Sequence, residues 1–183
     1  MPVDEALLIK RAQRKDSAAI EALIYAYEKR VYNVAYRYMG NEADAWDMAQ
    51  EALIKLYKNV SSFKGRSSFS SWVYRLTVNT CLDGLRKRKK TLLSLDQTIE
   101  NGASYTDTAT PQPEEHALTA ELSEDIQKAI NTLSGDHKSV IILRDISGLS
   151  YEEISGCLGI SVGTVKSRIN RGRAKLRELL IQY

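Results

Sequence analysis

The stretch SYEEISGCLGISVGTVKSRINRGRAKLREL, residues 150–179, determines the fold expected for the C-terminal part of the chain. Ser150 and Glu153 have the Ser-x-x-Glu spacing of a capping box, which predicts the start of a short helix. A tight turn containing glycine follows, and Ser161 is placed to cap a final helix over about residues 162–181. Two helices joined by such a turn, the second of them basic, predict a helix-turn-helix.

The final helix divides into an apolar face and a polar, basic surface when its residues are placed 100° apart. The apolar face comprises Val165, Ile169, Leu176, Leu179 and Leu180. The start of the helix and its remaining surface provide Ser161, Thr164, Lys166, Ser167, Arg168, Asn170, Arg171, Arg173 and Lys175. In the major groove, Arg and Lys donate to guanine and Asn pairs with adenine, so we expect this helix to read duplex DNA. The alternative is an ordinary solvated helix, since basic residues also favour helix C-termini.

Apolar residues recur at helical spacing through most of the remaining chain, and we find no convincing alternating strand. Asp16 is expected to cap a helix that ends at Gly40, and a second helix should follow over about residues 42–58. A loop at residues 61–68 precedes a long third helix, which continues into the basic run at residues 86–90. The pattern therefore predicts an all-helical protein.

Residues 91–118 differ in composition from the rest of the chain, because they contain five acidic residues and no basic ones. Their Ser, Thr, Gly and Pro content predicts a flexible acidic linker between two small helical domains, residues 1–90 and 119–183. The N-terminal domain holds 17 Lys and Arg against 10 Asp and Glu, and positions 166–177 hold six basic residues and no acid. Two basic zones indicate two surfaces that contact polyanions.

Several classes of function are disfavoured by the same sequence. No apolar run is long enough to span a bilayer, and the N-terminus is too polar for a signal peptide, so we expect a cytoplasmic protein. Cys81 and Cys157 lie far apart, and with only two histidines they do not make a zinc site, so we expect them to be small, partly buried helix residues. A DNA-processing enzyme such as a recombinase needs a nucleophile with a supporting charge cluster, and the serine-rich loop offers only Arg66 and Arg75. We expect neither enzymatic activity nor a cofactor.

Three segments together resemble one protein family. Residues 150–179 resemble the promoter-reading helix-turn-helix of extracytoplasmic-function (ECF) sigma factors, within the sigma-70 family. The segment DAWDMAQEALIKLY, residues 44–57, is similar to the one that grips the clamp coiled coil of RNA polymerase. FKGRSSFSSWVYRLTVNTCLDGLRKRKK, residues 63–90, resembles the segment that opens and reads the −10 element. The resemblance implies a factor that carries core RNA polymerase to promoter DNA.

The resemblance also implies roles for individual residues. It assigns binding of core polymerase to Asp44, Asp47, Gln50 and Glu51. It assigns capture of the melted −10 strand to Lys64, Arg66, Ser68, Tyr74, Arg75, Asn79, Asp83, Arg86, Lys87 and Arg88. The surface of the final helix is then expected to read the −35 duplex. Tyr74 is favoured for base stacking because it lies off the apolar stripe that contains Phe69 and Trp72.

Two alternatives remain open on the sequence alone. The acidic residues of the second helix and the basic run at residues 86–90 can both be ordinary solvated surfaces. The whole chain can instead be a stand-alone helix-turn-helix regulator, which would bind DNA without polymerase, usually as a dimer. The family resemblance further implies that an anti-sigma factor is a possible partner.

Overall fold

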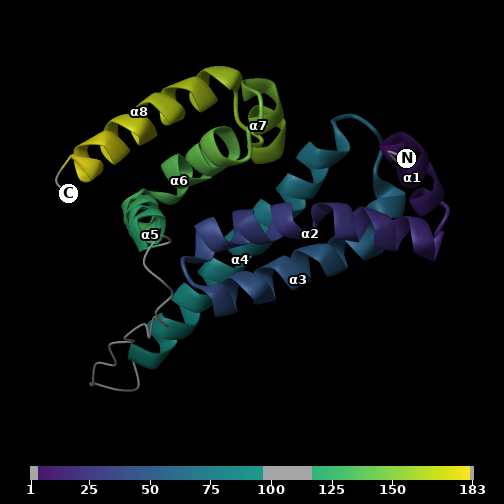
Figure 1. Cartoon of the computed structure of the whole chain (residues 1–183), viewed down its shortest axis with the longest axis horizontal. Coiled ribbons are helices and arrows are strands. Elements are labelled where there is room, and N and C mark those ends of the chain that lie inside the picture. The colour runs from purple at the N-terminus through teal and green to yellow at the C-terminus, as the bar shows by residue number, and fades with distance from the viewer. Residues whose placement is uncertain (1–3, 97–116, 182–183) are drawn as a thin grey trace.

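The computed structural model describes residues 4–96 and 117–181, and every regular element in these two ranges is a helix (Figure 1). In chain order the elements are α1 (Glu5–Gln13), α2 (Ser17–Met39), α3 (Glu42–Asn59), η1 (Val60–Ser62), α4 (Phe69–Asp96), α5 (Ala117–Thr132), α6 (Gly135–Ile141), η2 (Ile142–Ile146, a π-helical turn), α7 (Tyr151–Leu158) and α8 (Val162–Leu180). The prediction of an all-helical protein is confirmed. None of these helices combines the length and the apolar character needed to cross a bilayer.

The ends of α2 follow the signals in the sequence. Asp16 caps the helix by accepting a hydrogen bond of 3.2 Å from the Ala19 N–H. Gly40 ends it in the left-handed conformation, with φ of 79°, and Asn41 then caps α3. A Cβ at position 40 would also lie 2.6 Å from the Asn131 side-chain nitrogen. Glycine therefore permits both the turn and the close approach of α5.

Two elements differ from expectation. The first helix, α1, was not predicted, although Asp4 caps it and Leu8, Ile9 and Ala12 have helical spacing. Helix α4 continues through Asp96, so the first residues of the expected linker are helical, because Leu is a good helix former and no Gly or Pro intervenes. Most of the expected linker lies outside the described residues.

An aromatic cluster fixes the loop before α4. The centre of the Phe69 ring lies 5.4 Å from the ring centre of Tyr27, 5.2 Å from that of Phe63 and 5.5 Å from that of Trp72. All four rings are buried, so Phe69 and Trp72 are core residues as predicted. Because Phe63 and Phe69 are both anchored, the polar loop between them is held at the surface.

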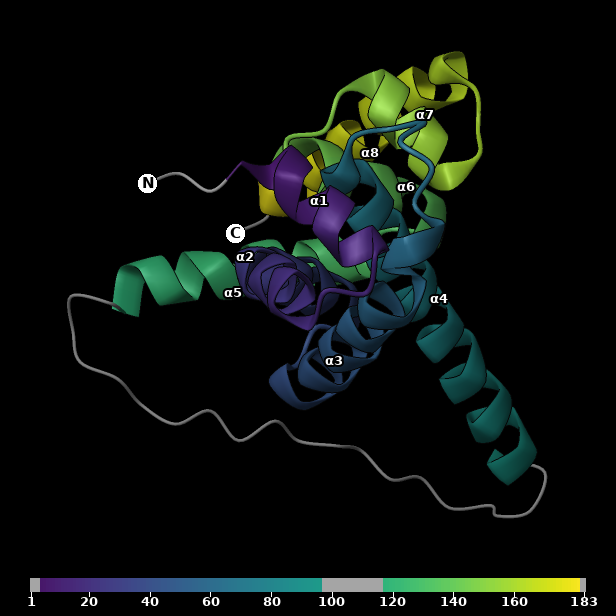
Figure 2. The same ribbon diagram turned by 90° about the vertical axis from the view of Figure 1, so that its right-hand side faces the viewer.

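The two halves of the described chain pack against each other. Helix α7 contacts α4, while α5 and η2 contact α2, so buried side chains of both halves form one continuous core. Cys81 and Cys157, one in each half, are both buried, more completely than predicted. Figure 2 shows α7 beside the start of α4, whose C-terminal part projects away from the other helices.

Candidate nucleic-acid interface

The helix-turn-helix of α7 and α8 is built by local signals. Both hydrogen bonds of the capping box are present, from the Glu153 N–H to Ser150 Oγ (3.2 Å) and from the Ser150 N–H to Glu153 Oε2 (2.9 Å). Gly159 ends α7 in the left-handed conformation, with φ of 66°, and Ser161 accepts a hydrogen bond of 3.1 Å from the Thr164 N–H. The predicted caps and turn are confirmed.

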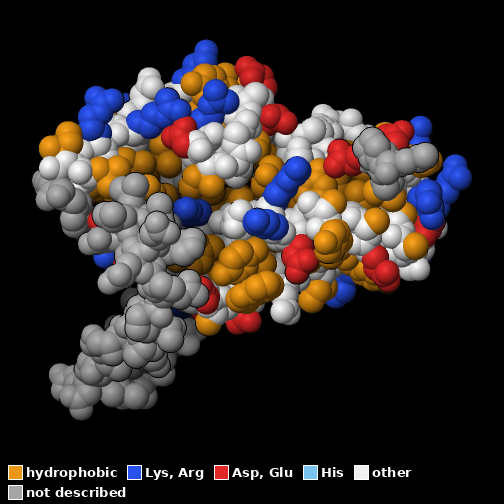
Figure 3. All heavy atoms as spheres, in the orientation of Figure 1, with side chains coloured by type: hydrophobic (Ala, Val, Ile, Leu, Met, Phe, Trp, Pro, Cys, Tyr) orange, Lys and Arg blue, Asp and Glu red, His pale blue; other side chains and the backbone are white. Residues whose placement is uncertain are grey.

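Burial of the apolar face of α8 determines which of its side chains are exposed to solvent. Val165 and Ile169 are fully buried, whereas Leu180 at the end of the helix is 38% exposed. Gly172, which we did not predict to be important, is buried where α8 packs against α6. A Cβ at this position would lie 2.9 Å from Ile141 Cγ1, so glycine permits the close approach of the two helices. Figure 3 shows Lys and Arg side chains gathered over α8 on the face shown there.

The predicted −35 residues of α8 fall into two groups. Arg168 pairs with Asp136 of α6, and Arg173 pairs with Asp145 of η2, so both arginines bind acids within their own half. Lys166 and Arg171 are exposed, and neither forms an ion pair within residues 4–96 and 117–181. Lys166 Nζ instead lies 5.8 Å from the centre of the Tyr151 ring. The exposed residues of the predicted set are Ser161, Lys166, Ser167, Asn170, Arg171, Arg173 and Lys175.

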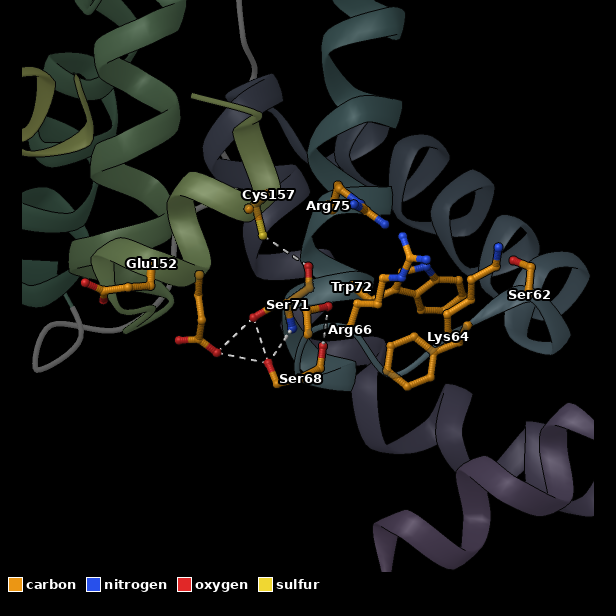
Figure 4. Close-up of a pocket in the computed structure, with 13 residues that line it drawn as sticks. Ser62, Lys64, Arg66, Ser68, Ser71, Trp72, Arg75, Glu152 and Cys157 are labelled. Carbon is orange, nitrogen blue, oxygen red and sulfur yellow. Dashed lines mark hydrogen bonds between the residues drawn. The ribbon is translucent and has the colours of Figure 1, made fainter. Parts of the chain in front are cut away.

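A pocket of about 510 Å³ lies between the loop before α4 and helix α7 (Figure 4). The predicted −10 residues in its lining are Lys64, Arg66, Ser68 and Arg75. Figure 4 shows these basic side chains on one side, with Glu152 and Cys157 of α7 on the other. The lining residues that we did not predict for the −10 site are Ser62, Phe63, Ser67, Ser71, Trp72, Glu152, Glu153, Gly156 and Cys157. The last four belong to α7 and lie more than 80 positions from Ser71, so no local sequence pattern connects them with the loop.

The remaining −10 residues follow the surface of α4. Arg75, Asn79, Asp83 and Arg86 are all exposed, and steps of four, four and three residues place them along one side of the helix. Asp83 and Arg86 pair at 3.2 Å, so these two side chains orient each other. Lys87 and Arg88 continue the exposed basic run.

Tyr74 differs from expectation. We predicted an accessible stacking ring, but the side chain is only 7% exposed, and burial raises the pKa of its hydroxyl. Tyr74 lies within electrostatic range of Arg30 on α2 and Glu153 on α7. The helical periodicity of α4 does not reveal this burial, because Tyr74 lies off its apolar stripe.

The four residues predicted to bind polymerase lie on α3. Asp47 and Gln50 are exposed. Glu51 is half-buried and pairs with Lys55 at 2.9 Å, and this hydrogen bond lowers the pKa of the Glu51 carboxyl. Asp44 accepts a hydrogen bond of 2.5 Å from Arg88 of α4, a residue that we predicted to bind DNA.

Exposed apolar residues lie beside these acids. Trp46, Ile54 and Tyr57 of α3 are each about half exposed. The Trp46 ring packs 4.7 Å from that of Tyr32 on α2, so an aromatic pair borders the acidic edge. An edge that combines exposed aromatic and acidic side chains is suited to bind another protein.

These features define a class of helical protein with a helix-turn-helix and a second basic surface. The sequence matches the family models of Sigma-70 region 2 over residues 23–91 and Sigma-70, region 4 over residues 123–176. It is 38% identical over 184 residues to the ECF RNA polymerase sigma factor SigW of Bacillus subtilis, covering 94% of each chain. It is 35% identical over 171 residues to the ECF RNA polymerase sigma factor SigE of Mycolicibacterium smegmatis, covering 92% of this chain and 65% of that protein.

A solved structure agrees with these relatives. The sigma factor RpoE of Bartonella quintana, solved in complex with the anti-sigma factor NepR, superposes with a TM-score of 0.70 at 26% identity. The match covers 87% of this chain and 95% of that one. The chain therefore belongs to the ECF subfamily of sigma-70 RNA polymerase sigma factors, a non-enzymatic family that directs transcription initiation.

Proposed function

We propose that this chain binds core RNA polymerase through an N-terminal domain, residues 1–90, and reads two separate promoter elements. The observation that carries the proposal is the presence of two exposed basic surfaces on one chain, one on α8 and one on α4 with its preceding loop. A C-terminal domain, residues 119–183, would bind the −35 element, and the chain between the domains would connect them. The protein would act in the cytoplasm, where polymerase and promoter DNA are found.

Recognition of the −35 duplex is proposed for α8. Lys166, Asn170 and Arg171 are exposed on the surface left by the buried apolar face, and this is the surface that a helix presents to the major groove. A well-formed bidentate base contact discriminates by about 1–3 kcal/mol, so two or three such contacts give useful specificity. Arg173 and Lys175, further along the helix, are better suited to phosphates.

Capture of the melted −10 strand is proposed for the pocket and for the exposed side of α4. An unstacked base needs polar partners and a stacking surface, and the pocket offers serine hydroxyls and the planar guanidinium groups of Arg66 and Arg75, with Trp72 also in its lining. Asn79, Asp83 and Arg86 extend this polar surface along the helix. Unstacking a base costs a few kcal/mol, and these contacts would offset that cost.

Docking on polymerase is proposed for α3. Its acidic residues would meet basic groups on a helical partner, the clamp coiled coil, while Trp46, Ile54 and Tyr57 supply apolar contact area. Each DNA surface alone offers few phosphate contacts, so free protein should bind DNA weakly. Holding both surfaces on polymerase raises their effective concentration at adjacent elements. The likeness to a sigma factor solved with an anti-sigma factor supports regulation by such a partner.

In vitro transcription tests this proposal. Purified protein is mixed with core RNA polymerase of its own organism and a fragmented genomic template, and the RNA start sites are mapped. We expect defined transcripts only when both proteins are present. Transcription that is inhibited or unaffected, together with tight DNA binding by the protein alone, would instead identify a stand-alone regulator.

A further inference from the structure

One carboxylate joins the beginnings of two helices from different halves of the chain. Glu153 Oε2 accepts the Ser150 N–H at the start of α7. Glu153 Oε1 accepts the hydroxyls of Ser71 at 2.8 Å and Ser68 at 2.9 Å, at the start of α4. Figure 4 shows these contacts as dashed lines from Ser68 and Ser71. The backbone hydrogen bond from Ser150, followed by those from the two serine hydroxyls, lowers the pKa of Glu153, so it is ionised at neutral pH.

This contact closes one side of the pocket. Glu152, Glu153, Gly156 and Cys157 of α7 form a wall opposite the basic loop and Arg75. The Cys157 thiol donates a hydrogen bond of 3.1 Å to the Ser71 carbonyl, and its side chain is only 6% exposed. An anionic side chain therefore lies where Lys64, Arg66 and Arg75 would otherwise meet an anionic ligand.

A second set of contacts holds the same two halves together at the end of α2. Lys138 Nζ donates to the Tyr38 carbonyl at 2.8 Å and to Asn131 Oδ1 at 2.9 Å. Arg37 donates to the side-chain oxygen of Gln127 at 3.0 Å, and Gln127 donates back to the Arg37 carbonyl at 3.2 Å. Hydrogen bonds thus join the halves in two regions, of which the one that contains Glu153 and Cys157 lies in the pocket.

We propose that the free protein is self-inhibited by this packing, with Glu153 of α7 standing in the −10 pocket in place of DNA. The inference rests on the proposed function of that pocket. Entry of a melted base requires α7 to leave α4, which exposes Ser71 and Cys157 and frees the hydroxyl of Ser68, a residue that is already exposed. Binding to polymerase, which must place the two DNA surfaces on separate elements, favours the open form. Apparent DNA affinity of the free chain is reduced by the fraction of molecules that are closed.

Alkylation of the native cysteines measures this opening in the full-length protein. Cys157 becomes accessible when α7 leaves α4, and its labelling rate is compared with that in denatured protein. Cys81 is fully buried close to Lys138 of α6, so its labelling reports a wider separation of the two halves. Burial also raises the pKa of Cys157 to about 11, so the closed thiol reacts slowly with iodoacetamide. Mass spectrometry then gives the labelling rate at each cysteine.

The test variant is Glu153→Gln, because Gln keeps the capping box of α7 but removes the charge that strengthens the contacts to α4. Glu124→Gln on α5 is the control, since it makes the same chemical change at an exposed site outside the pocket. We expect Cys157 to label at least about fivefold faster in Glu153→Gln than in wild type, and at the wild-type rate in Glu124→Gln. Binding of a fluorescent random single-stranded DNA dodecamer should tighten about threefold or more.

A second variant covers the case in which Glu153→Gln does not fold. Ser71→Ala removes one hydroxyl donor from the contact and should also accelerate labelling of Cys157. Equal labelling of wild type and folded variants would overturn the inference, as would a wild-type Cys157 that reacts as fast as in denatured protein. If labelling behaves as expected but no polymerase-dependent transcript is made, the closed packing stands and the proposed function fails.

Discussion

Arg88 of α4 and Asp44 of α3 form an ion pair of 2.5 Å between the surface proposed for DNA and the edge proposed for polymerase. Asn41 also donates to the same Asp44 carboxylate, at 2.8 Å. The start of α3 is therefore tied to the basic part of α4, beyond which that helix projects (Figure 2). A residue expected to contact DNA thus also orients a residue expected to contact polymerase.

Arg88→Ala should cause only a small loss of stability. Both side chains of this pair are more than a third exposed, and exposed ion pairs contribute about 0–1 kcal/mol. We expect the free energy of unfolding in urea to fall by less than about 1 kcal/mol, with Lys89→Ala as the exposed control. A loss much larger than this, or one that is insensitive to salt, would contradict a surface role for the pair.

The double substitution Asp47→Lys with Glu51→Lys should weaken binding to core polymerase by tenfold or more, on the order of the cost of placing like charges at an interface. Its effect on folding should be small, because Asp47 is exposed and the Glu51–Lys55 pair is a surface pair. Titration of labelled polymerase measures the affinity, with Glu21→Lys and Glu28→Lys on α2 as the charge-matched control. An unchanged affinity for core polymerase would show that α3 is not part of the surface that binds polymerase.

The basic residues of α8 should differ in role: some recognise DNA bases, and others stabilise the packing of α8 against its neighbouring helices. Arg171→Ala should weaken binding of the holoenzyme to a −35 duplex by about 1–3 kcal/mol and change base preference at one position. Arg173→Ala should lower thermal stability slightly, because it breaks the pair with Asp145 on η2, and should weaken DNA binding equally for every sequence, without a change in base preference. Binding assays against single-base duplex variants, together with melting curves, compare the two substitutions. Identical profiles for both would contradict this division.

Lys138 should make stability depend on alkaline pH. Burial lowers its pKa from 10.5 to about 8. Between these values the unfolded chain keeps a proton that the folded chain has released, so the free energy of unfolding should rise with pH in this window and not below it. Relative to Lys138→Met, the rise should be at most about 3 kcal/mol between pH 8 and 10.5. Urea unfolding of wild type and of Lys138→Met gives the difference in their free energies of unfolding at each pH. The titration of the buried thiols is common to both proteins and so cancels in this difference.

No relative rise in this window would show that Lys138 stays charged in the folded chain. A fall with increasing pH would require the opposite pKa shift. Either result would contradict the desolvation of the Lys138 ammonium group in the folded chain.

Local features of this fold were predictable because they depend on neighbours in the sequence. The caps at Asp16 and Ser161 and the capping box of Ser150 and Glu153 all act across two or three residues. The apolar face of α8 likewise follows from periodicity alone. The end of α4 was placed too early because the composition of residues 91–118 changes before the helix does.

The packing of the two halves was not predictable in the same way. Glu153 was correctly identified as a capping residue, but nothing in its local pattern indicates that its other oxygen binds Ser71, 82 positions away. The pocket combines predicted loop residues with α7 for this reason. Periodicity shows which face of a helix is apolar, but it does not identify which helix will cover its polar residues.

Selection of DNA from a random-sequence library by the reconstituted holoenzyme tests the central claim most directly. The account predicts two conserved blocks at a fixed spacing, recovered only with polymerase present, of which Arg171→Ala alters one and Asn79→Ala the other. A single block, or a palindrome recovered equally well by the free protein, would contradict it.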